Sequence, residues 1–233
     1  MDIKAIIFDK DGTIADFGVT FNRATKLVLD EICQGDPELM EQAASALDYD
    51  LSSNMIGKNS VIIAGSGVDI AEALSSVLEI EDVETYGASI DEIYGEICLN
   101  MVEALPGATK ALERLNEADI PLGVATNDSE ENAINQLESM EVDHLFDHIF
   151  GADSGYGPKP GTGMIDTFVE QLGLRPEQVL VVGDSVHDMG AGRAAGVKTC
   201  AVETGPATRE ELLPHADIVL SSISELPDYL NVG

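Results

Sequence analysis

The chain has 233 residues, enough for one large domain or for a domain with an insertion. Its 43 acidic and 12 basic residues give a formal net charge of −31. Such a surplus of negative charge argues against nucleic acid or an anionic membrane as a partner.

The first predicted strand is the short apolar run Ala5-Ile6-Ile7-Phe8, typical of a strand buried in a parallel sheet. The next clear strand, 120–125, comes only about a hundred residues later. The interval has helical spacing of apolar residues, with breaks at Gly35-Asp36-Pro37 and Gly65-Ser66-Gly67. We therefore predict a helical domain inserted over residues 17–101. Its predicted helices are 21–32, 37–47, 70–78 and 89–104.

After Leu105-Pro106-Gly107, helices and strands alternate regularly. This alternation predicts an α/β core of residues 1–16 and 102–233, with a doubly wound parallel sheet covered by helices on both faces. The predicted helices are 108–117, 130–140, 161–172 and 188–195, and the predicted strands after the insertion are 120–125, 148–151, 179–182, 199–202 and 218–219.

Polar motifs directly follow three of the strands. Asp9-Lys10-Asp11-Gly12-Thr13 follows the first, Thr126-Asn127 follows strand 120–125, and Gly183-Asp184-Ser185-Val186-His187-Asp188 follows strand 179–182. A fourth motif is Lys159, within Gly-Pro-Lys-Pro. Because the carboxyl ends of parallel strands border a common crevice, we expect these groups to meet there.

The residue types favour phosphoryl transfer. The carboxylates of these motifs are too dense to stay unpaired, and Mg²⁺ prefers carboxylate oxygens, waters and a substrate phosphate. One aspartate could then attack phosphorus, while Thr126 donates to a phosphoryl oxygen and Lys159 neutralises charge. The predicted metal site comprises Asp9, Asp11, Asp184 and Asp188.

In this order, the four motifs resemble those of haloacid dehalogenase-superfamily phosphohydrolases, of the phosphoglycolate phosphatase-like group. The resemblance runs through most of the chain, and implies a Rossmann-like core with a helical cap that closes over the site. It implies that Asp9 is the nucleophile forming an aspartyl-phosphate, and that Asp11 is the general acid and then base. It further implies that Asp184 and the main-chain carbonyl of Asp11 bind Mg²⁺, with Asp188 supporting that shell.

The first motif also has a physical logic of its own. A turn at Gly12 can bring Asp11 back over the site, where neighbouring negative charge should raise its pKa and suit it to proton transfer. Lys10 stands where the family more often has an apolar or aromatic residue. Alternation along the chain predicts that the Lys10 side chain points away from Asp9 and Asp11.

Substrate contacts are predicted in both parts of the chain. Lys58, in Gly57-Lys58-Asn59-Ser60, is the only basic residue between Lys26 and Lys110. Cap loops of related sugar-phosphate enzymes have a basic residue after a glycine in a similar place, so Lys58 is a candidate for binding a carboxylate or second anionic group; the alternative is a solvated lysine. The predicted substrate-binding residues are Gly12, Lys58, Thr126, Asn127 and Lys159.

Each motif alone has a structural interpretation. Asp-x-Asp-Gly-Thr fits an ordinary turn, Thr126-Asn127-Asp128 fits a helix N-cap, and Lys159 fits a solvated loop. Asp184 could simply cap the next helix, and His187 is predicted to have a surface or capping role, because imidazole is a poor ligand for Mg²⁺. The presence of all four motifs in order favours the functional interpretation.

We therefore predict a Mg²⁺-dependent phosphatase acting on a small phosphorylated metabolite, with 2-phosphoglycolate the first candidate. The alternatives are a phosphosugar mutase, a phosphonate hydrolase using Lys58 as a Schiff-base nucleophile, or a non-catalytic phosphate-binding protein. We expect a monomer or homodimer. Three cysteines without metal spacing, no basic start and no membrane-length apolar run predict a cytoplasmic protein.

Overall fold

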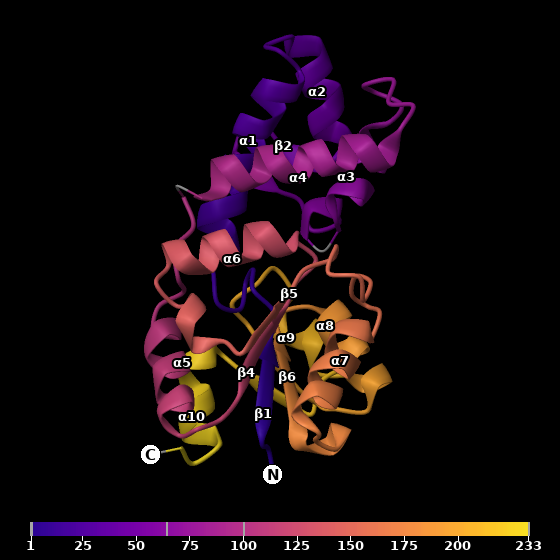
Figure 1. The fold of residues 1–233 in the computed structure, drawn as a ribbon. Coiled ribbons are helices and arrows are strands. Elements are labelled where there is room, and N and C mark those ends of the chain that lie inside the picture. Colours follow the sequence, from indigo (N-terminus) through magenta and orange to yellow (C-terminus); the bar gives the residue numbers. More distant parts are fainter. Residues whose placement is uncertain (1, 64, 100, 233) are drawn as a thin grey trace. The chain divides into compact units, whose positions relative to one another are not determined.

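The computed structural model describes residues 2–63, 65–99 and 101–232, and the chain divides into two compact units (Figure 1). The first unit comprises Met1–Asp16 and Glu103–Gly233, and the second comprises Phe17–Val102.

A parallel sheet of six strands forms the centre of the first unit, in the order β5-β4-β1-β6-β7-β8. The chain runs outward from β1 through β4 to β5, and then returns to β6 on the other side of β1. In register, Phe8 of β1 lies opposite Val124 of β4 and Val182 of β6. The residues that follow these strands therefore emerge together at one edge of the sheet. The strands are β1 (Ala5–Phe8), β4 (Leu122–Ala125), β5 (His148–Phe150), β6 (Val179–Gly183), β7 (Lys198–Val202) and β8 (Ile218–Leu220).

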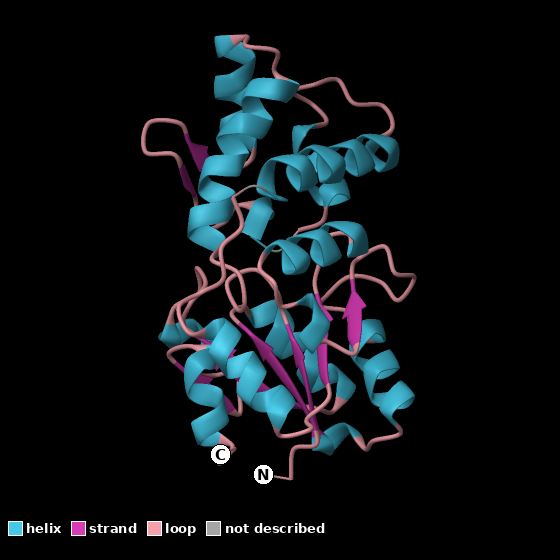
Figure 2. Cartoon of the chain, turned by 60° about the vertical axis from the view of Figure 1, so that its left-hand side comes forward, coloured by secondary structure: helices cyan, strands magenta, loops and turns pink. Residues whose placement is uncertain are grey.

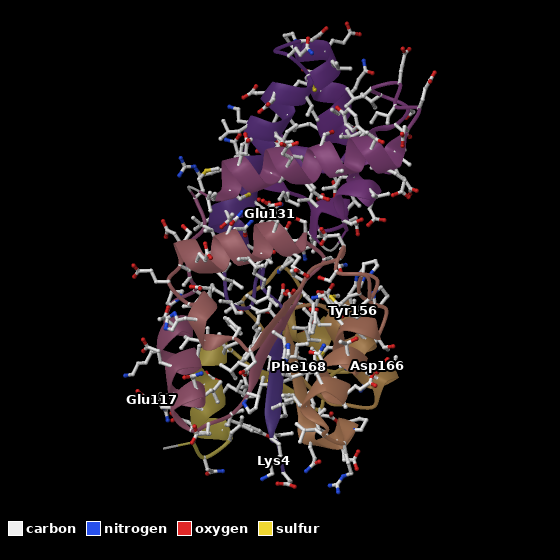
Figure 3. The ribbon with its side chains drawn as sticks, in the orientation of Figure 1. Lys4, Glu117, Glu131, Tyr156, Asp166 and Phe168 are labelled. Carbon is white, nitrogen blue, oxygen red and sulfur yellow. The ribbon has the colours of Figure 1, made fainter. Side chains whose placement is uncertain are left out.

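Helices cover both faces of this sheet (Figure 2), which confirms the predicted Rossmann-like α/β fold class. Ile6 and Phe8 of β1 belong to one apolar cluster with residues of α5, α6 and α10, whereas Ile7 belongs to the cluster on the opposite face with residues of α7 and α8. In the second cluster Phe168 is completely buried, while Asp166 of the same helix is exposed (Figure 3). The helices are α5 (Ala108–Glu117), α6 (Glu130–Ser139), α7 (Gly163–Leu172), α8 (Val186–Ala195), α9 (Arg209–Leu212) and α10 (Leu226–Tyr229), with 3-10 turns at Asp143–Leu145, Pro176–Gln178 and Ile223–Glu225.

The second unit is mainly helical and has its own apolar core, which includes Leu29, Leu74 and Ile90. Two of its helices, α2 and α3, begin at capping residues located in the predicted breaks. The Asp36 side chain accepts hydrogen bonds from two N–H groups of α2, and Ser66 forms a capping box with Asp69 at the start of α3. The elements are α1 (Phe17–Ile32), α2 (Pro37–Ala46), β2 (Tyr49–Asp50), β3 (Met55–Ile56), a 3-10 turn at Val61–Ile63, α3 (Gly67–Leu74) and α4 (Val83–Leu99).

Several features of this interval differ from the sequence predictions. The helix predicted at 70–78 begins and ends earlier, at Gly67–Leu74, and the helix predicted at 21–32 begins earlier, at Phe17. The helix predicted at 89–104 begins and ends earlier, at Val83–Leu99, and Ala104 instead forms a β-bridge with Ala15. The small antiparallel pair β2–β3 was not predicted, because strands of two residues are too short to show alternation.

The cysteines and the length of the helices also bear on the character of the protein. Cys33, Cys98 and Cys200 are all buried and free. Within the described residues, no helix combines the length and apolar character needed to span a bilayer.

Candidate active site

The loop after β1 folds tightly back on itself. The Asp9 N–H donates across to a β6 carbonyl at 2.8 Å, and the main-chain carbonyl of Lys10 accepts hydrogen bonds from the N–H groups of Ile14 and Ala15 at 2.8 and 2.9 Å. Gly12 has φ of +78°, the left-handed region that favours glycine. The turn predicted at Gly12 is therefore present, and it brings Asp11 back near the end of the strand.

Asp184 follows β6 and lies against two glycines. A Cβ atom on Gly12 would lie 2.5 Å from Asp184 Oδ2, and one on Gly205 would lie only 1.5 Å from it. The neighbouring Thr204 hydroxyl donates to the Gly12 carbonyl at 2.6 Å, which fixes the two loops together. The sequence prediction missed Thr204 and Gly205, although their position directly after strand β7 was a usable signal.

Asp188 is held by the first turn of α8. Its Oδ2 accepts hydrogen bonds from the Ser185 N–H at 3.1 Å and the Ser185 hydroxyl at 2.5 Å, and Ser185 in turn accepts from the Asp188 N–H. Ser185, not Asp184, therefore caps this helix. One carboxylate oxygen from each of Asp9, Asp184 and Asp188 lies within 4.8 Å of the others.

Lys159 places its ammonium group inside this acidic cluster. The Nζ atom lies 2.6 Å from Asp9 Oδ1 and 2.6 Å from Asp188 Oδ1, and its side chain is only 7% exposed. The solvated-loop interpretation of Lys159 is therefore wrong. Asn127 clamps the Lys159 backbone, because its amide accepts from the Lys159 N–H at 2.7 Å and donates to the Lys159 carbonyl at 3.0 Å. The Lys159–Pro160 peptide is cis.

Burial controls the electrostatics of this cluster. It raises the pKa of Asp9 to about 6, against the opposing attraction of Lys159 and with a further contribution from Asp188. Burial also raises the pKa of Asp184, and the charges of Asp9 and Asp188 add to the effect. One lysine facing three carboxylates leaves surplus negative charge, so these oxygen donors fit a hard divalent cation such as Mg²⁺.

Thr126 and Asn127 follow β4, as expected. Thr126 is buried, and its hydroxyl oxygen accepts a hydrogen bond from the Asp128 N–H at 3.2 Å, an arrangement that leaves the O–H able to donate to another group. The helix N-cap is Ser129, not one of these residues. The role found for Asn127 is to position Lys159, and its contact with substrate stays a prediction.

The prediction for Lys10 was wrong. Its side chain does not point away from Asp11: Lys10 Nζ lies 2.7 Å from Asp11 Oδ2 and 3.2 Å from Asp128 Oδ2, and the side chain is fully buried. Simple strand alternation does not apply here, because the tight turn around the Lys10 carbonyl changes the direction of the chain. Burial lowers the pKa of Lys10, but Asp11 and Asp128 raise it by more, so the ammonium stays charged.

Asp11 consequently has a different setting from the other three predicted metal ligands. Burial raises its pKa and Lys10 opposes this, while Asp128 adds to the rise. Its side chain is not a member of the group of three carboxylates. The predicted contact of Asp11 with the metal, through its main-chain carbonyl, stays a prediction.

The remaining candidates, Lys58 and His187, are exposed residues. Lys58 belongs to the second unit, where it is exposed on a turn that Asp48 fixes by accepting from the Asn59 N–H at 3.1 Å. His187 is exposed on α8, consistent with the surface role predicted for it.

The chain is similar to known hydrolases in both sequence and fold. The sequence profile described as haloacid dehalogenase-like hydrolase matches residues 6–202. A phosphoglycolate phosphatase of Aliivibrio fischeri is 28% identical over 205 residues, covering 88% of this chain and 86% of that protein. An N-acetylmuramic acid 6-phosphate phosphatase of Pseudomonas aeruginosa is 27% identical, covering 99% and 96% of the two chains. The crystal structure of a predicted phosphoglycolate phosphatase from Haemophilus somnus has the same fold, with a TM-score of 0.76, 22% identity and 99% of each chain covered.

Proposed function

Since this chain belongs to the haloacid dehalogenase-like hydrolase family, we propose that it hydrolyses a small phosphate monoester through an aspartyl-phosphate formed on Asp9. The observation that carries the proposal is the buried cluster in which Lys159 Nζ lies 2.6 Å from both Asp9 and Asp188. A carboxylate kept in such a setting beside a fixed ammonium is suited to attack a phosphoryl group whose charge would otherwise repel it.

Four side chains of this protein have separate roles in the proposed reaction. Asp9 attacks phosphorus, while Lys159 holds the Asp9 carboxylate in place and neutralises charge. Thr126, whose hydroxyl can still donate, binds a phosphoryl oxygen. Asp11 gives a proton to the departing alkoxide, and later takes one from the water that attacks the aspartyl-phosphate.

The residues that would hold Mg²⁺ are Asp9, Asp184 and Asp188 through their carboxylates and Asp11 through its main-chain carbonyl. A bound Mg²⁺ supplies positive charge that offsets the negative charge shared by the carboxylates and the phosphoryl oxygens. The glycines at 12 and 205 let Asp184 reach this position without a clash.

We assign choice of substrate to the second unit, as a cap, because the motifs of the first unit engage only the phosphoryl group. The substrates in the names of the two curated relatives, phosphoglycolate and N-acetylmuramic acid 6-phosphate, each combine a phosphate monoester with a carboxylate. Lys58 is the candidate partner for such a carboxylate. We therefore propose a small carboxylated phosphate monoester as substrate.

The test is phosphate release from a panel of monoesters that includes 2-phosphoglycolate, N-acetylmuramic acid 6-phosphate and hexose phosphates, with Mg²⁺ or with EDTA. Asp9→Asn should abolish release without loss of the fold. Asp166→Asn is the matched control, because Asp166 is an exposed aspartate on α7 (Figure 3). A brief reaction with ³²P-labelled substrate, quenched in acid, should leave label on the wild-type chain and none on Asp9→Asn.

Other results would point elsewhere. Full activity of Asp9→Asn would refute Asp9 as the nucleophile. Interconversion of hexose phosphates without release of phosphate would indicate a mutase, and saturable phosphate binding without turnover would indicate a binding protein.

A further inference from the structure

Lys10 is a fully buried lysine whose ammonium faces three oxygens. Its Nζ donates to Gln136 Oε1 at 2.6 Å and lies 2.7 Å from Asp11 Oδ2 and 3.2 Å from Asp128 Oδ2. An ammonium has three N–H donors, so each of these three acceptors can take one. A buried charge is tolerated only when paired in this way, which indicates that the contacts of Lys10 are built into the fold.

Two partners of Lys10, Gln136 of α6 and Asp128 just before that helix, are themselves fixed. Asp128 Oδ1 accepts from the Ser129 N–H at 2.8 Å and from the Asn132 amide at 3.1 Å. Asp128 Oδ2 accepts from the Gln136 amide at 3.3 Å as well as pairing with Lys10. Since Asn132 and Gln136 are four residues apart on α6, they present their amides on one face of the helix. Gln136 and Asp128 thus form a polar socket for the Lys10 ammonium.

This socket determines the setting of the two Asp11 oxygens. Oδ2 is held by Lys10, whereas Oδ1 is buried and has no hydrogen-bond partner among the described residues. A buried carboxylate oxygen without a partner is costly in a folded protein and calls for a reason. The two oxygens of Asp11 are therefore not equivalent.

We propose that Lys10 is a positioning residue that anchors Asp11 by Oδ2 and so leaves Oδ1 as the atom that gives and takes the proton. The inference rests on the proposed function. In the first half-reaction the Oδ1–H bond breaks, the proton goes to the leaving alkoxide oxygen, and the phosphoryl group passes to Asp9. In the second, a water oxygen bonds to phosphorus, its proton returns to Oδ1, the Asp9–phosphorus bond breaks and phosphate leaves.

An apolar residue at position 10 could not make this anchor, since it has no donor. Without it the Asp11 carboxylate could turn about its own bonds and be misaligned for proton transfer. Misplacement of a reacting group by about 1 Å can cost on the order of a hundredfold in rate. Lys10 itself touches neither the leaving group nor the phosphoryl group in this proposal.

The test uses the dependence of rate on the leaving group. p-Nitrophenolate departs without needing a proton, whereas the alkoxide of 2-phosphoglycolate requires one. In Lys10→Met, kcat/KM for 2-phosphoglycolate should fall on the order of a hundredfold, and kcat/KM for p-nitrophenyl phosphate only by about threefold or less. Lys4→Met is the matched control, because Lys4 is an exposed lysine that precedes the opposite end of β1 (Figure 3).

A second variant is needed because Lys10→Met could fail to fold. Lys10→Met leaves the Asp11 and Asp128 carboxylates buried without their cation, so Lys10→Met/Asp128→Asn removes one charge of each sign. Its crystal structure, compared with wild type, should show the Asp11 carboxylate turned away from its wild-type orientation. That readout does not depend on activity.

Several results would overturn the inference. An unmoved Asp11 carboxylate in the double variant would show that Lys10 does not position it. An equal loss of kcat/KM on both substrates would assign Lys10 to stability alone, and a gain on 2-phosphoglycolate would mean that Lys10 restrains Asp11 from reacting. Wild-type protein that hydrolyses no monoester would instead refute the proposed function, and with it the proton transfer assigned to Oδ1.

Discussion

Gly205→Ala should weaken the site without changing any polar group. A Cβ atom at this position would lie 1.5 Å from Asp184 Oδ2, 2.3 Å from Cγ and 2.6 Å from Cβ. Rotation of the Asp184 carboxylate cannot relieve the clash, because its Cβ is also too close. Either the backbone after β7 or the end of β6 must move.

The distances set the size of the effect. A displacement of about 1 Å is needed to restore an ordinary contact, and a change of that size at a reacting group can lower the rate on the order of a hundredfold. Overpacking of this kind typically costs about 1–3 kcal/mol in the free energy of unfolding. A moving loop would also pull Thr204 from the Gly12 carbonyl, now 2.6 Å away, and so disturb the turn that places Asp11.

The assay is phosphate release titrated with Mg²⁺, together with calorimetric Mg²⁺ binding and thermal unfolding. Gly190→Ala is the matched control, because a Cβ atom there would meet nothing within 4 Å and Gly190 lies within α8. That control should keep full activity and gain about 0.5–1 kcal/mol of stability. If Gly205→Ala kept wild-type Mg²⁺ affinity and kcat/KM, the close packing of Asp184 against this glycine would have no functional importance.

Four further substitutions test the electrostatics and the choice of substrate. Burial raises the pKa of Asp9 to about 6, above its unfolded value of 3.8, so the folded metal-free protein binds more protons than the unfolded chain. Its stability should therefore fall as pH rises through about 4 to 6. Thermal unfolding in EDTA at a series of pH values should show this fall, and Asp9→Asn should reduce it. Asp188→Asn should weaken Mg²⁺ binding, measured by calorimetry, about 10- to 100-fold. Asp128→Asn should leave Mg²⁺ binding unchanged and lower kcat/KM selectively for alkyl phosphates. Lys58→Ala should raise KM for carboxylated monoesters and not for p-nitrophenyl phosphate, and equal KM changes on both would remove Lys58 from carboxylate recognition.

Local patterns predicted the elements of the core closely. The helix predicted at 108–117 is α5 with the same bounds, because its apolar positions and the preceding Pro-Gly break leave little choice. The strand predicted at 120–125 begins later, at Leu122, since apolar Ile120 extends the pattern beyond the ladder. The helix predicted at 188–195 begins earlier, at Val186, because the Ser185–Asp188 capping box was overlooked.

Contacts between distant residues could not be predicted in this way. The geometry of a parallel sheet explains why the loops that follow β1 and β6 converge. It does not reveal that the amide of Gln136, 126 positions away, accepts from Lys10, or that Gly205 borders Asp184. Such contacts depend on how α6 and the loop after β7 pack, which no short window of sequence contains.

The placement of the two buried lysines also fits the two kinds of chemistry that we propose for this acidic crevice. Lys159 joins Asp9 to Asp188, and Lys10 joins Asp11 to Asp128. Each ammonium therefore offsets one pair of carboxylates, and the first members of the two pairs, Asp9 and Asp11, are only two positions apart in the same loop. Like charges so close would otherwise raise each other's pKa values together. Separate counter-ions would therefore let Asp9 act as the proposed nucleophile while Asp11 transfers protons. In a chain of net charge −31, the two lysines that would serve the proposed reaction are thus buried instead of lying on the surface.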